Sequence, residues 1–207
     1  MTSSIIAQRS SPLHSGIAEQ RMSVSHLCSS LPKTHNERQG YVQIYFGAGK
    51  GKTTAALGLS MRTILTGGSV YFAQFFKGVE TAELGLPALS DRFIIEQYGT
   101  GHFVSGLIGP EEISTAQRGI QHCADILKSG YFDLVVLDEI LLSVMYQILT
   151  IHELIALLEM RKSHVEVVVT GRYVPQELLK VADLVTEMKK VKHYYDQGVR
   201  ARKGIEF

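Results

Sequence analysis

One eight-residue stretch combines the residue types that bind phosphate: Gly47, Ala48, Gly49, Lys50, Gly51, Lys52, Thr53 and Thr54. It follows an apolar run (41–46) and precedes a helical pattern, which is the layout of a P-loop. Glycines let successive backbone N–H groups turn toward one anion, and the helix dipole points to the same place. We expect Lys52 to contact the outer phosphates and the Thr53 hydroxyl to bind magnesium. The stretch therefore predicts a nucleotide site.

The loop departs from the usual spacing at one position. A P-loop normally has its first glycine five residues before the glycine of Gly-Lys-Thr, but that position is Phe46 and the glycine follows at Gly47. Lys50 also adds a second cation beside Lys52. Two lysines suit a highly charged anion such as a whole triphosphate, although simple solvent exposure of Lys50 is the alternative.

Other polar residues follow apolar runs that resemble buried strands. Asp138 and Glu139 come directly after 134–137, about 85 residues beyond the loop lysine, and an acid at such a strand end can reach magnesium. The alternative is that the two acids cap a helix before Ile140. Arg172 follows the run at 165–169, where it could neutralise phosphate or remain a solvated surface residue.

Strand-like and helix-like patterns alternate from Tyr41 onward. Helical patterns begin at Lys52, at Pro110, at the Thr150-x-x-Glu153 capping box and at Pro175. Apolar or β-branched runs predict strands at 41–46, 69–76, 92–98, 132–137, 165–169 and 184–188, the last as a core strand. This alternation predicts a three-layer α/β domain with a mostly parallel central sheet. Ligands of such sheets bind at the carboxyl ends of the strands.

Length and composition limit the number of domains, the possible partners and the location of the protein. A chain of 207 residues with 45% hydrophobic residues suits one domain, which we place at 41–207, and a net charge of +1 gives no attraction to nucleic acid or membranes. Residues 1–40 are serine-rich and acid-poor. This segment resembles an organellar transit peptide but lacks an amphipathic stripe, so we expect a flexible arm, or an over-extended start with Met22 as the alternative initiator. The two cysteines have no metal-ligand spacing, and a cytoplasmic location is expected.

The C-terminal segment is basic between Lys189 and Lys203. Such a run is most often a solvated face, and here the alternative is that it helps to cover an anionic ligand. The sequence contains neither an Asp-x-x-Gly switch pattern nor an Asn-Lys-x-Asp guanine motif, and no evident base is placed to activate a hydroxyl or water.

Several of these motifs together resemble one family, the P-loop ATP:corrinoid adenosyltransferases. The loop GAGKGKTTAALG is similar to that family's GNGKGKTTAA-G, including the displaced glycine and the extra lysine. The segments QFFKG (74–78), VVLDE (135–139) and TGR (170–172) and the ending VKHYYDQGVRARKGIEF (191–207) also match family patterns. The resemblance covers roughly residues 40 to 207.

This resemblance implies a RecA-like fold, usually a homodimer, that binds ATP, Mg²⁺ (or Mn²⁺) and a corrinoid. Co(I) of the corrinoid attacks the 5′ carbon of the ATP ribose and expels triphosphate, and a flavoprotein is a possible cobalt reductant. Carried over to this chain, the resemblance places the triphosphate on Gly47–Thr54, and the metal near Thr53, Asp138 and Glu139. Arg62 is then assigned to nucleotide contacts.

Two positions depart from the family pattern. Ala48 replaces a common asparagine, which removes a side-chain contact but leaves the backbone cradle intact. Where well-known members place a Phe and a Trp near the corrinoid, this chain has His102-Phe103-Val104 and no Trp at all. His102 is expected either to contact the corrinoid or to face solvent. The competing functions are a RecA-like ATPase that releases orthophosphate, and a non-catalytic module that only binds ATP.

Overall fold

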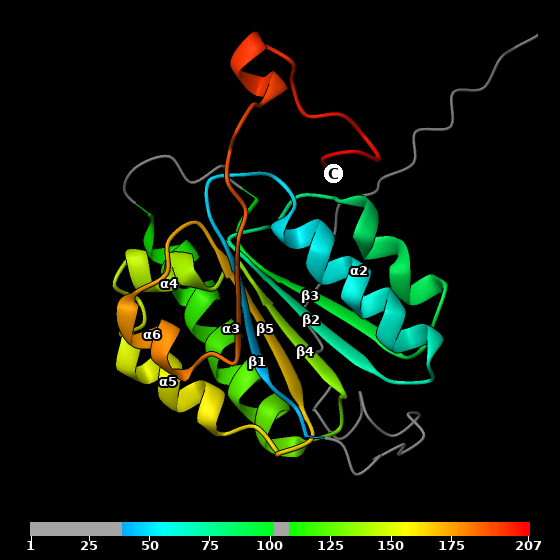
Figure 1. Ribbon diagram of the computed structural model, residues 1–207, viewed down its shortest axis with the longest axis vertical. Coiled ribbons are helices and arrows are strands. Elements are labelled where there is room, and N and C mark those ends of the chain that lie inside the picture. Colours follow the sequence, from blue (N-terminus) through cyan, green and yellow to red (C-terminus); the bar gives the residue numbers. More distant parts are fainter. Residues whose placement is uncertain (1–38, 102–107) are drawn as a thin grey trace, which may run out of the picture.

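The computed structural model describes residues 39–101 and 108–207. Its centre is a six-stranded sheet in the order β3-β2-β4-β5-β1-β6, and every neighbouring pair is parallel (Figure 1). The strands are β1 (Val42–Phe46), β2 (Val70–Phe75), β3 (Phe93–Tyr98), β4 (Leu134–Asp138), β5 (Glu166–Gly171) and β6 (Leu184–Glu187). Each lies within two or three residues of a predicted strand. The predicted parallel α/β sheet is confirmed.

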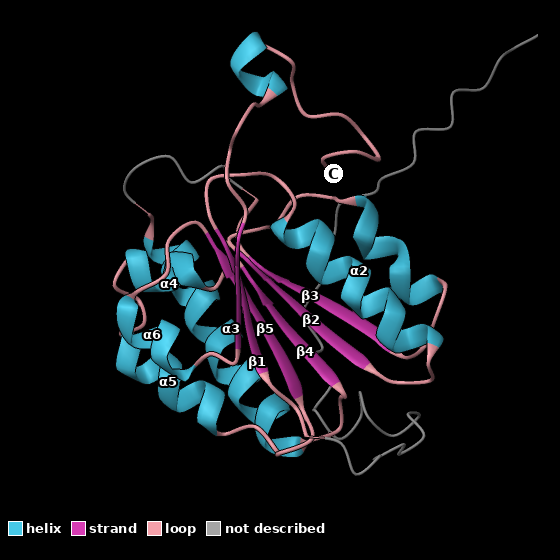
Figure 2. Ribbon diagram, viewed as in Figure 1, coloured by secondary structure: helices cyan, strands magenta, loops and turns pink. Residues whose placement is uncertain are grey.

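Helices cover both faces of this sheet (Figure 2). α2 (Lys52–Leu65) and the 3₁₀ helix η1 (Ala82–Ala88) lie on one face. The other face carries α3 (Pro110–Ser129), α4 (Leu141–Met145), α5 (Ile151–Glu159) and α6 (Gln176–Val181). A second 3₁₀ helix, η2 (Tyr194–Gln197), belongs to the C-terminal tail. The layers are those of the predicted three-layer, RecA-like P-loop fold.

Local sequence explains the elements that frame the sheet. β2 and β4 are buried at every position because helices cover both of their faces, which accounts for their continuous apolar runs. α3 begins with Pro110 and ends at Gly130, whose left-handed φ of 67° terminates the helix. α5 begins at the complete capping box predicted from Thr150 and Glu153.

One strand prediction is wrong in its burial. We expected 184–188 to form a core strand, but all four residues of β6 are exposed. Among the described strands, β6 lies at the edge of the sheet and pairs on one side, with β1. Its apolar residues therefore lack the double cover that buries β2 and β4.

Strand order sets the geometry of the ligand edge. β5 lies between β1, which leads into the glycine-rich loop, and β4, which ends in Asp138. The carboxyl ends of all strands share one edge because the sheet is parallel, so the loop, Asp138 and Thr170 converge there. None of the helices in the described residues is long and apolar enough to cross a bilayer.

Candidate nucleotide-binding site

The displaced glycine of the loop has a structural cause. Gly47 has a φ of 115°, and a Cβ at this position would lie 2.5 Å from the carbonyl oxygen of Met188. A Cβ on Gly49 would lie 2.6 Å from the same oxygen, because the Gly49 N–H donates to it at 2.7 Å. The segment that follows β6 thus runs directly against the loop, and only glycine fits at Gly47.

Lys52 points into the loop that precedes it. Its ammonium donates to the carbonyl oxygens of Gly47 at 2.8 Å and Gly49 at 3.0 Å. Burial lowers the pKa of Lys52, partly opposed by the nearby carboxylates of Glu139 and Asp138. The cation is therefore held at the centre of the loop, where a phosphate would gain most from its charge.

Asp138 is the centre of a buried polar cluster. Its carboxylate accepts hydrogen bonds from Thr53 Oγ1 at 3.0 Å, from Thr170 Oγ1 at 2.8 Å and from Lys77 Nζ at 3.0 Å. The residue is completely buried, so the Lys77 charge and the two hydroxyls balance a carboxylate that would otherwise be costly. The pairing of Thr53 with Asp138 joins the P-loop to the end of β4.

Glu139, next in the chain, faces the opening instead. Its φ of 60° is left-handed, which is uncommon for a residue with a side chain, and its N–H donates to Thr170 Oγ1 at 2.8 Å. Burial raises the pKa of Glu139, and Asp138 adds to this effect. α4 has its N-cap at Ile140 without a side-chain capping bond, so neither acid caps a helix as the alternative supposed.

A cavity of about 840 Å³ opens beside the loop. Its polar lining comes from loop residues and from Lys77, Thr81, Glu83, Glu139, His193 and Glu206. The larger part of the wall is apolar and comes from α2, the end of β2, η1 and the C-terminal tail: Leu57, Met61, Phe75, Phe76, Val79, Leu86, Ile205 and Phe207. Phe76, like Glu139, has a left-handed φ directly after a strand. The space therefore suits a ligand with an anionic end and a large apolar part.

The remaining predicted site residues, Arg172, Arg62 and His102, do not all lie at the loop. Arg172 is exposed after β5, and its charge is close enough to affect the pKa values of Lys52 and Glu139. Arg62 is exposed in the last turn of α2, roughly 15 Å along the axis from Lys52 at about 1.5 Å per residue. His102 lies outside the described residues. The structure brings Arg172 to the site but places Arg62 away from the loop.

Sequence reasoning did not give Lys77 or Thr170 a role, although it placed both at strand ends. It also missed the C-terminal residues that line the cavity. Two signals pointed to this tail: its basic character, for which covering an anionic ligand was one of two interpretations, and the similarity of the ending 191–207 to the family pattern.

The oxygen atoms at the end of β4 suit magnesium. The described residues contain no cluster of three or more His, Cys, Asp and Glu side chains that would form a complete protein cage. The Thr53 hydroxyl does lie 3.0 Å from Asp138, and Glu139 faces the cavity beside them. Magnesium typically takes one or two carboxylates and completes its shell with phosphates and water, so this donor set fits the ion.

Comparison with known proteins gives a consistent match. Residues 38–207 match the family model described as ATP:corrinoid adenosyltransferase BtuR/CobO/CobP. The corrinoid adenosyltransferase CobA of Salmonella typhimurium is 33% identical over 83% of this chain and 87% of its own. The corrinoid adenosyltransferase of Escherichia coli K12 matches equally, and that of a Sinorhizobium species is 30% identical over 84% and 83%. The crystal structure of the RadB recombinase is similar over 75% of this chain, with a TM-score of 0.47 and 19% identity. The chain belongs to the ATP:corrinoid adenosyltransferase family.

Proposed function

We propose that this protein transfers the 5′-deoxyadenosyl group of ATP to the Co(I) centre of a corrinoid. The Co(I) electron pair forms a bond to the 5′ carbon, the bond from that carbon to oxygen breaks, and triphosphate leaves with its electrons. Family membership supports the reaction, and the observation that carries it is one cavity lined both by the cationic loop and by a broad apolar surface.

The reaction assigns the protein two tasks. Co(I) is a strong nucleophile that carries no proton, so activation by a general base is unnecessary. The protein has to hold the 5′ carbon in line with the cobalt and to stabilise the charge of the departing triphosphate. Lys52, the loop backbone and the dipole of α2 all act on that charge, and Arg172 stands beside them.

The residue roles proposed from this geometry centre on the loop. The loop 47–54 holds the triphosphate through its backbone N–H groups, with Lys52 against the phosphates. Thr53, Asp138 and Glu139 would hold the Mg²⁺ ion (or Mn²⁺), which supplies further positive charge to the leaving group when bound. Asp138 fixes the Thr53 hydroxyl through their hydrogen bond. The proposed contact of Arg62 with the nucleotide stays a family-based prediction, and His102 stays either a corrinoid contact or a residue that faces solvent.

The resemblance to the family also supports proposals about the setting of the enzyme. We propose a homodimer that acts in the cytoplasm and receives Co(I) from a separate reductase such as a flavoprotein. The near-neutral net charge of +1 supports small-molecule substrates rather than nucleic acid as partners.

A single assay tests the reaction. The protein is incubated with MgATP and chemically reduced cobalamin or cobinamide, and the adenosylated product is followed by its absorbance while inorganic products are identified. Adenosylcorrinoid and triphosphate in equal amounts are expected. Orthophosphate without an adenosylated product would show an ATPase instead, and no turnover of either kind would show a binding module.

A variant pair tests the loop. Lys52→Ala is expected to lower kcat/KM by at least about 100-fold, because it removes the cation that faces the leaving group. Lys180→Ala, which removes an exposed lysine of α6, serves as the matched control and should retain full activity. Full activity of Lys52→Ala would contradict the assignment of the loop.

A further inference from the structure

The C-terminal tail, defined here as residues 188–207, turns back over the phosphate-binding loop (Figure 1). Two backbone hydrogen bonds begin this contact. The N–H of Met188 donates to the carbonyl of Phe46 at 2.7 Å, and the carbonyl of Met188 accepts from the N–H of Gly49 at 2.7 Å. The tail is therefore joined to the loop itself rather than to a distant part of the surface.

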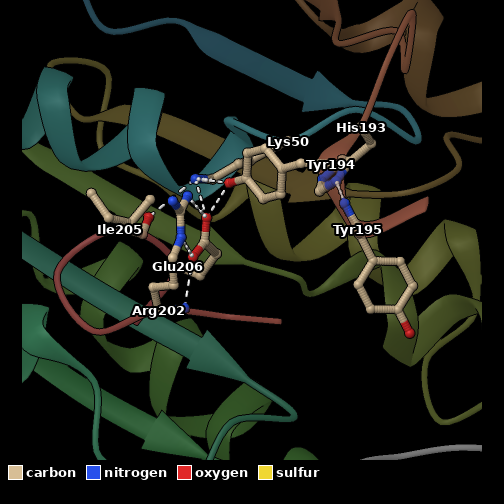
Figure 3. A network of polar contacts seen from close by, with 7 residues as sticks. All are labelled: Lys50, His193, Tyr194, Tyr195, Arg202, Ile205 and Glu206. Carbon is tan, nitrogen blue, oxygen red and sulfur yellow. Dashed lines mark hydrogen bonds and ion pairs between the residues drawn. The ribbon is translucent and has the colours of Figure 1, made fainter. Parts of the chain in front are cut away.

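Lys50 makes the second connection between loop and tail. Its ammonium donates to Glu206 Oε1 at 2.9 Å, to the Tyr194 hydroxyl at 3.0 Å and to the Ile205 carbonyl at 3.2 Å (Figure 3). A lysine ammonium has three hydrogens, and all three are used by residues 144 to 156 positions further along the chain. Lys52, in contrast, donates to backbone carbonyl oxygens of the loop itself.

Glu206 is the acceptor around which the tail is organised. Besides Lys50, its carboxylate accepts from the Tyr194 hydroxyl, from the Arg202 N–H at 2.7 Å and from the Arg202 guanidinium at 3.3 Å. The Arg202 guanidinium also lies over the Tyr194 ring, 4.9 Å from its centre. Hydrogen bonds led by that from Arg202 lower the pKa of Glu206, so it stays ionised. The side chain is only 16% exposed.

This anchor determines where the last residues lie. Ile205 and Phe207, on either side of Glu206, line the same cavity as the apolar residues of α2 and β2. They remain 55% and 40% exposed, so they form the open rim of the cavity rather than its floor. The phosphates fix ATP at the floor, next to Lys52. The rim is left for the second substrate, a large macrocycle that can cover such an apolar edge.

We propose that Lys50 and Glu206 are positioning residues that hold Ile205 and Phe207 as an apolar wall for the corrinoid. This assignment rests on the proposed function, and it replaces the phosphate contact that the sequence suggested for Lys50. Both residues act on corrinoid binding through the tail, while ATP is bound by the loop backbone and Lys52.

Steady-state kinetics with MgATP and reduced cobinamide test whether Lys50 and Glu206 act on corrinoid binding rather than on ATP binding. Lys50→Met and Glu206→Gln should each raise KM for cobinamide about tenfold, as expected for the loss of a charge-assisted hydrogen bond, and change KM for ATP less than about threefold. The double variant should be no worse than either single one, because both remove the same contact. The charge-exchanged pair Lys50→Glu/Glu206→Lys should recover part of the loss. Phe207→Ala should reproduce the cobinamide effect with the anchor intact.

Two controls distinguish a failure of the anchor proposal from a failure of the proposed function and from a general effect of charge. Lys203→Met removes a positive charge from the same exposed segment and should change neither KM. Amide hydrogen exchange at Gly204, Ile205 and Glu206, whose N–H groups are hydrogen-bonded within the tail, should be at least about tenfold faster in Lys50→Met than in the wild type, a readout that needs no activity. Failure of the wild type to adenosylate cobinamide would refute the proposed function and leave this readout of the anchor intact. A tenfold rise in KM for ATP in Lys50→Met, absent in Glu206→Gln, would overturn the proposal and return Lys50 to the phosphates.

Discussion

Replacement of Gly47 by alanine should destabilise the whole fold, although it adds a single methyl group. The φ of 115° at Gly47 is strained for any residue with a Cβ, at a cost of about 1–3 kcal/mol. The new Cβ would also lie 2.5 Å from the Met188 carbonyl oxygen, so Met188 has to move and its hydrogen bond with Gly49 weakens, at about 0.5–1.5 kcal/mol. Together these effects lower the free energy of unfolding by about 3 kcal/mol, or Tm by roughly 6–12 °C for a domain of this size.

Thermal unfolding followed by circular dichroism measures this loss, and a second glycine in the same stretch provides the control. Gly58 is exposed in the middle of α2, and a Cβ there meets no atom within 4 Å. Gly58→Ala should therefore stabilise the protein by about 0.5–1 kcal/mol, the difference in helix propensity. The two substitutions are chemically identical and should have opposite signs. A Tm of Gly47→Ala within about 2 °C of the wild type would refute the explanation of the displaced glycine.

Three further predictions follow from single contacts. Thr150→Ala should reduce the free energy of urea unfolding by about 0.5–2 kcal/mol, because it removes the capping box of α5; no measurable change would contradict that role. Burial raises the pKa of Glu96, but hydrogen bonds led by that with His122 outweigh it and bring the pKa to about 2, below its ordinary 4.5. Glu96 thus stabilises the fold fully above about pH 4.5 and loses this effect as the pH falls through 2, so Glu96→Gln should lose about 1–2 kcal/mol at pH 7 and only about a quarter of that at pH 2.5. Burial also raises the pKa of Cys123, and in a Cys28→Ser background an aromatic disulfide reagent should label it only after unfolding.

The sequence predicts most of the fold because the relevant signals are local. Runs of buried residues identify the strands, and the helix limits at Lys52, Pro110 and Gly130 are fixed by residue types that start or stop helices. η1 was missed because its seven residues, Ala82–Ala88, contain an internal proline and carry no helical periodicity. The exposure of β6 was missed because position in a sheet depends on strand order, which the apolar pattern of one strand does not contain.

For the site too, residues in short motifs were predicted from the sequence, and contacts between distant residues were not. Lys52, Thr53 and Asp138 were assigned from motifs whose spacing reflects the geometry of a P-loop beside a strand end, and the structure places Thr53 against Asp138 and Lys52 within the loop. The role of Glu206 could not be derived, because its partner Lys50 is 156 positions away and no short motif links them. Contacts of this kind become visible only when the tail is seen to return to the loop.

The position of β1 in the sheet has a consequence for the order in which the protein is completed. In the part of the chain that the structure describes, β1 pairs with β5 and β6, whose partner residues lie about 125 and 141 positions further along the chain. At about 5–20 residues per second, a ribosome takes roughly 6–25 s to make the first of these intervals. During this time the first strand has no neighbour with which to pair. The phosphate-binding loop is therefore among the earliest parts of the domain to be synthesised and among the last to acquire its working shape.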